Sequence, residues 1–198
     1  MNFEVPARYL ISPGDASAAN FLSFKEEFLA TIELAVSAGV SLIQIREKSL
    51  TTKQLFELAK AAAEITKGSA TRILVNGRAD VAVAANADGV HLPEDGMPIA
   101  AIRVSFPKLI IGKSVHTIEG AIDAKEADFL LFGPVFDSGE KKGVGVEALA
   151  AIVKAVNIPV LAVGGIDAAN FEQTISAGAA GFAAIRYLND HATLEKLR

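Results

Sequence analysis

The chain has 198 residues, of which 51% are hydrophobic and 21% charged, and its formal net charge at pH 7 is −4. This balance is typical of a well-packed globular protein and excludes a largely disordered one. The negative charge argues against nucleic-acid binding, which requires a basic field, so an anionic ligand would have to be held by local cations. Because the chain contains no cysteine, we expect neither a disulfide framework nor a thiolate metal site.

The segment from Met1 to Val5 lacks the charged stretch and apolar run of a signal peptide. No apolar stretch approaches the roughly 20 residues needed to span a bilayer, so we expect a cytoplasmic protein without membrane contact. The length suits one sizeable core, and no linker or low-complexity segment divides it. We therefore predict a single domain over residues 1–198.

Short β-rich runs alternate with longer helical patterns along the whole chain. The predicted strands span residues 8–12, 41–46, 72–76, 89–92, 108–113, 129–133, 158–163 and 181–185. Strands that are apolar on both faces and separated by helices pair in parallel through right-handed crossovers. Eight such units in 198 residues predict a compact (β/α)8 TIM barrel, a fold of the α/β class. An open doubly wound sheet is the alternative, but no GxGxxG motif follows the first strand.

Helix signals lie between these strands. Two segments begin with a capping box, Ser23 with Glu26 and Thr51 with Gln54. Residues 146–156 carry apolar side chains at the 3.6-residue period of a helix that covers a sheet. Three glycines follow helical patterns, at positions typical of C-caps: Gly39, Gly89 and Gly178.

Polar side chains gather where the predicted strands end. Gln44, Arg46 and Lys48 project to the same side under strand alternation, and an amide with two cations can hold an anionic planar group. Taken alone, this segment is equally well a strand that ends in a solvated turn. In TIM barrels, however, ligands bind at the carboxyl ends of the strands. Further polar residues end other strands: Asn76, His91, Lys113, Ser114, His116 and Arg186.

A glycine pair follows the seventh predicted strand. Gly164 and Gly165 precede Asp167 and a helical pattern, and bare N–H groups at a helix N-terminus favour phosphate. Such glycines can also merely permit a tight turn. The loops after strands seven and eight are the usual phosphate site of a TIM barrel, which favours the functional interpretation.

The three histidines differ in position. His116 lies at the predicted mouth just before a helix near Thr117, and the ordinary histidine pKa near 6.5 suits proton transfer at neutral pH. His91 ends an apolar strand, where a structural and a catalytic role are both open. His191 lies in the last helix, where a surface role is expected. Glu94 and Asp95 lie near the mouth, where a metal site is conceivable and a polar turn is simpler.

Six segments occur in order along the chain: QIREK at 44–48, VNGRAD at 75–80, ADGVHL at 87–92, GKSVH at 112–116, FGPVF at 132–136 and GGI at 164–166. Together they resemble the thiamine-phosphate synthase and TenI family. The resemblance implies a TIM barrel, usually a homodimer, that acts on thiazole phosphates in thiamine biosynthesis.

The synthase branch joins a pyrimidine diphosphate to a thiazole phosphate with Mg²⁺. Its pattern has an aspartate after the asparagine of strand three and another five residues after the histidine of strand four. Here these positions hold Gly77 and Gly96, with Asp95 beside the second. Residues 137–142 replace a Thr-x-Thr-Lys pattern that serves the diphosphate. Mg²⁺ needs carboxylate oxygens and a diphosphate needs donors, so these departures weaken the match.

The TenI branch is more similar at the same places, with Asn-Gly-Arg at 76–78, Ser-Val-His at 114–116 and Lys-Lys-Gly at 141–143. The resemblance therefore implies a thiazole tautomerase, an isomerase that moves a proton on a thiazole carboxylate phosphate without metal or cofactor. His116 matches the histidine of the family and would be the acid–base. Two alternatives remain, a synthase with altered metal ligands, which alone would need Mg²⁺, and a non-catalytic barrel that binds a thiamine precursor and regulates through a partner.

The resemblance also implies binding residues for the small-molecule thiazole phosphate. Those expected to contact the substrate are Gln44, Arg46, Lys48, Asn76, Lys113, Ser114 and Lys142. Those expected at its phosphate are Gly164, Gly165, Ile185 and Arg186, the last two in place of the Val-Ser pair of the synthase.

Overall fold

The computed structural model of the chain describes residues 5–198, and its strands form a closed barrel in the order β1 to β8. The strands are β1 (Ala7–Ile11), β2 (Leu42–Ile45), β3 (Arg72–Asn76), β4 (Gly89–Leu92), β5 (Ile110–Val115), β6 (Phe129–Phe132), β7 (Val160–Val163) and β8 (Gly181–Ala184). Every neighbouring pair is parallel, and β1 closes the ring against β8 with Ala7 opposite Gly181. The predicted TIM barrel is confirmed.

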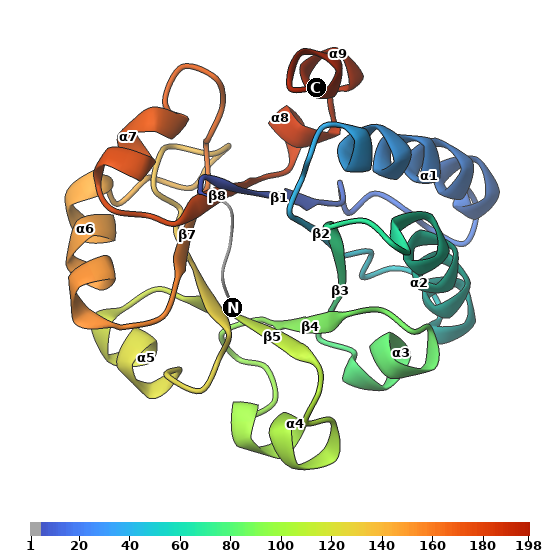
Figure 1. Cartoon of the computed structure of the whole chain (residues 1–198), viewed down its shortest axis with the longest axis horizontal. Helices are drawn as coiled ribbons and strands as arrows, with labels where there is room; N and C mark the ends of the chain where they lie inside the picture. Colours follow the sequence, from blue (N-terminus) through green and yellow to red (C-terminus); the bar gives the residue numbers. More distant parts are fainter. Residues whose placement is uncertain (1–4) are drawn as a thin grey trace.

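The helices form a layer outside the ring of strands (Figure 1). They are α1 (Phe21–Ser37), α2 (Thr52–Thr66), α3 (Ala79–Ala84), α4 (Ile99–Ser105), α5 (Ile118–Asp123), α6 (Val146–Ala155), α7 (Phe171–Ser176), α8 (Arg186–Asn189) and α9 (His191–Lys196). The last helix returns beside α1 (Figure 1). None of the helices within residues 5–198 is long and apolar enough to cross a membrane.

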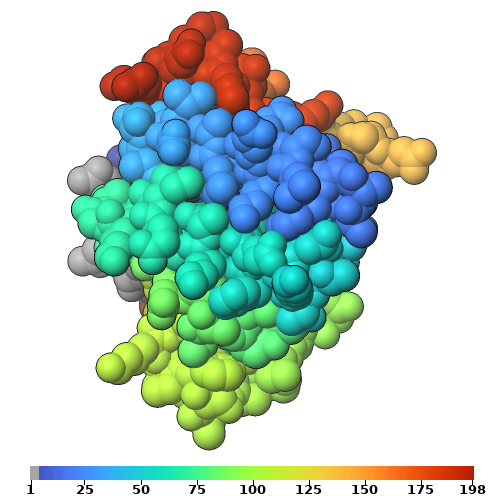
Figure 2. Space-filling view, turned by 90° about the vertical axis from the view of Figure 1, so that its right-hand side faces the viewer, coloured from blue at the N-terminus to red at the C-terminus, as the bar shows by residue number. Residues whose placement is uncertain are grey.

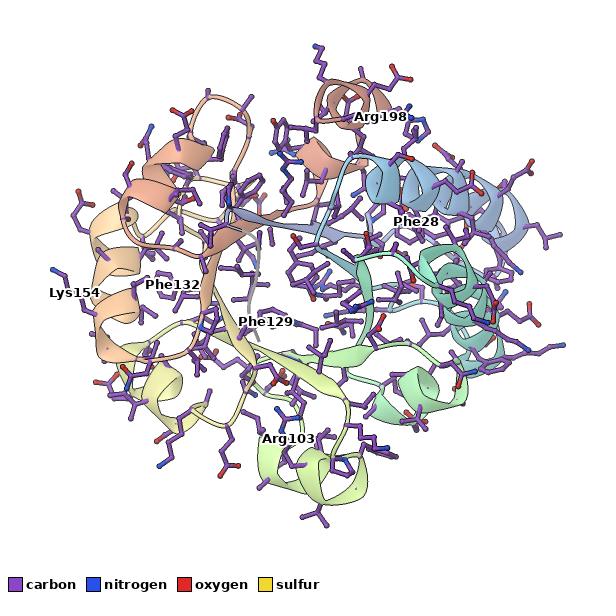
Figure 3. All side chains as sticks on the ribbon, in the orientation of Figure 1. Phe28, Arg103, Phe129, Phe132, Lys154 and Arg198 are labelled. Atoms are coloured by element: carbon purple, nitrogen blue, oxygen red, sulfur yellow. The ribbon has the colours of Figure 1, made fainter. Side chains whose placement is uncertain are left out.

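The core has two parts because successive side chains of a strand point to opposite sides. One set fills the barrel interior and includes Tyr9, Leu42, Leu74 and Phe129. The other set packs between the strands and the helices, as Phe132 does on the side of α6. Figure 3 shows Phe129 inside the ring and Phe132 toward the helix layer.

The predicted strands agree with the structure to within two residues at each end. The largest differences are at β5, which begins at Ile110 and not Lys108, and at β7, which begins at Val160 and not Ile158. In both cases the residues assigned too early belong to the turn that leads into the strand. The predicted helix over 146–156 is α6, which ends one residue earlier.

Two local predictions were wrong. The capping box of Ser23 and Glu26 is absent, since α1 begins at Phe21 and the Ser23 hydroxyl donates to the carbonyl of Asn20. Gly89 is not a C-cap but the first residue of β4, where a side chain would collide with Ile110 of β5.

Three other local predictions were confirmed. Gly39 and Gly178 have the positive φ of C-cap glycines, at 68° and 95°. The capping box of Thr51 and Gln54 is present at the start of α2, with the two residues bonding each other's backbone N–H.

Candidate active site

A cavity of about 920 Å³ opens at the carboxyl ends of the strands. The predicted residues that line it are Gln44, Arg46, Lys48, Asn76, Ser114, His116 and Ile185. The alternation of side chains along a strand explains why two of these residues line the cavity. Gln44 points to the same inward side as Leu42, and Asn76 to the same inward side as Leu74, and each lies two residues further along its strand than this interior core residue. We call this cavity the mouth.

The base of the mouth is polar but tightly packed. Gln44 is 1% exposed, and its Nε2 donates to the hydroxyl of Tyr9 at 2.8 Å. Tyr9 lies inside the barrel, where burial raises the pKa of its hydroxyl and keeps it neutral. The Tyr9 ring also packs edge-on against Phe129, with centroids 5.6 Å apart. The amide of Gln44 is therefore held in a fixed place beneath any ligand.

A buried carboxylate, which the sequence did not single out, anchors the loop before α1. Glu47 is 3% exposed and accepts the backbone N–H of Gly14 through Oε1 and that of Ala16 through Oε2, both at 2.9 Å. The N–H of Arg46 donates to Ser12 Oγ at 2.8 Å. These bonds tie the β1–α1 loop to the end of β2 and so fix the backbone that carries Arg46 into the mouth.

His116 follows β5 at the rim of the mouth. Its Nδ1 lies 2.6 Å from the carbonyl oxygen of Gly133. Because a carbonyl oxygen can only accept, Nδ1 must carry a proton. In the neutral ring Nε2 is then the bare nitrogen, and it lies 3.8 Å from Glu94 Oε2. The side chain is about half exposed, and the helix expected after it is α5, capped by Thr117.

Two predicted substrate contacts have other partners. The ammonium of Lys113 donates to the carbonyls of Pro93 and Glu94 at 2.8 and 2.9 Å, because Lys113 points to the opposite side of β5 from Ser114. Burial lowers the pKa of Lys113, while Glu94 and Asp95 raise it. The exposed Lys142 pairs with Asp137 at 2.8 Å. The contacts of both lysines with a substrate stay predictions.

Other residues of the loops face the mouth instead. Lys141 lines it in place of Lys142, on a short turn in which Ser138 and Lys141 bond each other's backbone. Figure 2 shows this β6–α6 loop, coloured gold, projecting from the body of the molecule. Acidic side chains line the mouth as well: Glu94, Asp95 and Glu140. Sequence reasoning noted the first two as a polar turn or a conceivable metal site, and it did not include Glu140 or Lys141 among the site residues.

The predicted phosphate residues line a second cavity of about 440 Å³ beside the mouth. All four are present: Gly164, Gly165, Ile185 and Arg186. Ser138 and Ile185 border both cavities, so one ligand can extend from one to the other. Arg186 is exposed and brings a cation to a net acidic chain.

The glycine turn differs from expectation in one respect. A turn over residues 167–170 follows it, and α7 begins only at Phe171, so no helix N-terminus directly adjoins Gly165. Gly165 has φ of 63° and lies against the β6–α6 loop, where an added Cβ would come within 2.9 Å of Phe136 Cβ. Close packing of two loops, and not only a phosphate, therefore requires a glycine here.

The mouth does not fit Mg²⁺ in the way that the synthase pattern requires. Gly77 and Gly96 offer no carboxylate, and an added Cβ at Gly96 would come within 2.9 Å of the Pro93 carbonyl. Within residues 5–198, no group of three or more histidine, aspartate or glutamate side chains is arranged to hold a metal ion. Since Mg²⁺ depends on oxygen ligands, we assign no step of the mechanism to it.

Comparisons with known proteins agree with this architecture. A putative thiamine-phosphate synthase from Geobacter sulfurreducens is 45% identical over 166 residues, which cover 80% of this chain and 78% of the relative. Thiamine-phosphate synthase from Pyrococcus horikoshii is 41% identical over 162 residues, covering 79% and 78%. The solved structure of thiamine phosphate pyrophosphorylase from Pyrococcus furiosus superposes with a TM-score of 0.81 at 31% identity, covering 96% and 94%.

The names of these relatives favour the transferase alternative over the isomerase, and none of them identifies the TenI branch. The family model described as thiamine monophosphate synthase matches residues 9–188, which include all the segments on which the resemblance rests. The chain therefore belongs to the TMP-TENI family of thiamine-biosynthesis enzymes.

Proposed function

We propose that the protein catalyses proton transfer on a thiazole phosphate, as a tautomerase of the TenI kind. The observation that carries the proposal is the bond from His116 Nδ1 to Gly133, which leaves Nε2 as the bare nitrogen at the mouth. A positioned histidine of this kind is a suitable general base at neutral pH. Glu94 Oε2 lies 3.8 Å from Nε2 and would stabilise the positive charge that the ring gains when it takes up a proton.

The two cavities suggest how such a substrate would be held. Its phosphate would occupy the cavity with Gly164, Gly165 and Arg186, and its ring would lie in the mouth. Arg46 and Lys48 line the mouth and would neutralise a carboxylate on the ring. The geometry thus supplies cations for both anionic groups of a thiazole carboxylate phosphate.

The chemistry balances with His116 alone. Nε2 takes a proton from a ring carbon, and the electron pair of the broken C–H bond moves into the ring system. The resulting imidazolium, whose proton can exchange with solvent, delivers a proton to a second carbon, which completes the aromatic tautomer. Composition and oxidation state are unchanged, so no second substrate is consumed.

Thiamine-phosphate synthase activity is the second candidate, and the names of the relatives favour it. Glu94 and Asp95 are the carboxylates at the mouth that a synthase with altered ligands would use. Lys141, within the 137–142 segment that replaces the diphosphate pattern, is the cation of that segment that lines the mouth. The absence of side chains at Gly77 and Gly96 weighs against this candidate.

Parallel assays distinguish the two activities. In one, the purified chain is given thiazole carboxylate phosphate in deuterated buffer, and NMR follows the tautomer and the incorporation of deuterium. In the other, thiazole phosphate and the pyrimidine diphosphate are supplied with Mg²⁺, and thiamine phosphate is measured. We expect turnover in the first. Mg²⁺-dependent coupling in the second, abolished by Asp95→Asn, would instead establish the synthase.

Two further properties belong to this proposal. We propose a single cooperative folding unit and a homodimer, the latter because the family resemblance implies it. Sedimentation equilibrium would test the dimer, and a single unfolding transition seen by both circular dichroism and fluorescence would test the single unit.

A further inference from the structure

His91 has one ring nitrogen without a partner. Among residues 5–198, its Nδ1 is the buried side-chain atom for which no hydrogen bond is found. The residue is 2% exposed at the end of β4, and its ring lies beside Tyr9 and Phe129, with centroids 5.8 and 6.1 Å away. The other nitrogen, Nε2, lies 2.9 Å from Ser114 Oγ. Ser114 in turn lines the mouth.

The ring is neutral at physiological pH. Burial above all, together with the nearby charges of Lys113 and Arg46, lowers the pKa of His91 to about 3. A neutral imidazole has one proton for two nitrogens. The position of that proton decides which partner donates in the bond between His91 and Ser114.

The surroundings of Nδ1 favour a bare nitrogen there. A proton on Nδ1 would be a buried N–H without an acceptor, which is rarer in proteins than an under-satisfied acceptor. A Cα hydrogen of Gly112 on the neighbouring strand also points at Nδ1, because a Cβ added in its place would lie 2.7 Å from that nitrogen. A lone pair tolerates a C–H group at that place, whereas an N–H would face it hydrogen to hydrogen.

We propose that His91 carries its proton on Nε2 and donates it to Ser114 Oγ, which turns the hydroxyl hydrogen of Ser114 toward the mouth. His91 is then a positioning residue that acts through Ser114. The pair differs from a serine nucleophile with its base, in which the histidine would accept the serine proton. Ser114 becomes an obligatory donor, strengthened by the bond that it accepts.

The consequence for ligands is a preference for acceptors. A hydroxyl that has already accepted one bond and points outward will favour an anionic oxygen or a ring nitrogen over a donor group. That this acceptor belongs to a thiazole phosphate rests on the proposed function. The location of the proton on His91 does not.

The direct test is ¹⁵N NMR of the histidine side chains in the full-length, unliganded protein, with His91 assigned through the His91→Asn variant. We expect Nε2 to have the chemical shift of a protonated nitrogen and Nδ1 that of a bare one, unchanged between pH 5 and 8. A protonated Nδ1 would overturn the proposal, whatever the protein binds.

A second test uses two amides of different reach. Gln at position 91 can place its NH₂ near the site of Nε2, whereas Asn reaches only the site of Nδ1. We expect His91→Asn to weaken thiazole phosphate binding about tenfold, the effect of one lost hydrogen bond, and His91→Gln to weaken it far less. With Ser114→Ala as the background, both substitutions should change affinity by less than about twofold.

The outcomes are separable. Equal losses from His91→Asn in the two backgrounds would show a merely structural role and overturn the positioning role. If the unmodified protein does not bind thiazole phosphate at all, the proposed function fails, and the NMR measurement still decides the location of the proton.

Discussion

The imidazole of His116 donates from Nδ1 to the carbonyl of Gly133, 2.6 Å away on the neighbouring strand end. This bond fixes both the orientation of the ring and its tautomer. It also links the end of β5 to the end of β6, so that the two loops that border the mouth are connected at His116.

The first prediction is that His116→Asn removes catalysis while preserving binding. Asn can place its NH₂ near the site of Nδ1 and keep the bond to Gly133, but it has no counterpart of Nε2. Tautomer turnover should fall by about 10² or more, the usual effect of losing a general acid–base, with little change in KM. His191→Asn is the matched control, since His191 bonds Thr31 on the outside of the barrel. Near-normal turnover of His116→Asn would move attention to His91.

The second prediction concerns the phosphate cavity. Arg186→Gln should weaken thiazole phosphate binding about tenfold, because a hydrogen bond to a charged group is lost, and it should reduce the salt dependence of binding. Calorimetric titration at two salt concentrations measures both effects. Lys154→Gln removes the same charge from the outer face of α6, where the side chain points away from the barrel (Figure 3), and should change neither. Equal effects of the two variants would contradict a phosphate at Arg186.

Arg186 is a better test of this cavity than Gly165. A bulky residue at Gly165 would test the same cavity only if it left the fold intact. The structure shows that such a side chain would strain a residue with φ of 63° and collide with the β6–α6 loop. A loss of binding would then have two explanations.

Strand periodicity predicts much of this site from the sequence. Because side chains alternate along a strand, Gln44 and Arg46 share the inward side of β2, and the structure places both at the mouth. The same rule places Lys113 and Ser114 on opposite sides of β5. The prediction that both side chains contact the ligand is therefore inconsistent with the alternation of side chains along a strand.

The loops could not be predicted in this way. Residues 137–142 have no repeating pattern, and the backbone pairing of Ser138 with Lys141 turns Lys141, and not Lys142, toward the mouth. The role of Glu47 also depends on tertiary structure, because its partners Gly14 and Ala16 lie more than 30 residues away in the chain. An acidic residue after a strand does not by itself indicate which backbone groups it will anchor.

The third prediction is that one added carboxylate improves the metal site. Gly77 has φ of 66°, and an added Cβ there would lie 4.0 Å from Pro93, next to Glu94 and Asp95. Gly77→Asp should therefore increase Mg²⁺ affinity at least about tenfold, which is ~1.4 kcal/mol. Gly77→Ala shares the backbone strain and should leave Mg²⁺ affinity unchanged. Calorimetric titration with Mg²⁺ compares them, and equal affinities would place Glu94 and Asp95 out of reach of residue 77.

The fourth prediction is that Glu47→Gln destabilises the fold and loosens the mouth. A glutamine has one oxygen and one NH₂, so either Gly14 or Ala16 would lose its acceptor and face a donor. The expected loss is about 1–3 kcal/mol, measured from urea unfolding, together with weaker ligand binding through Arg46. Glu33→Gln on the exposed side of α1 should have almost no effect. Equal stability of the two variants would show that the buried carboxylate is not an anchor.

The last prediction concerns pH. Since burial lowers the pKa of His91 from its ordinary 6.5 to about 3, the unfolded chain binds a proton between these values that the folded chain does not. The stability gained by keeping His91 neutral is thus fully present above pH 6.5 and is lost as the pH falls toward 3. The free energy of unfolding, relative to His91→Gln, should decrease by up to about 1.4 kcal/mol per pH unit in this window and stay constant above it.

Urea unfolding of both proteins from pH 4.5 to 8 measures this difference. Other titrating groups contribute to both proteins alike and cancel, so the slope reports His91 itself. Parallel curves across the range would mean that His91 takes up its proton in the folded protein near the ordinary pH. In that case the imidazolium would have two protons, and Nδ1 would be a buried donor without an acceptor among the described residues, while Nε2 would still donate to Ser114 Oγ.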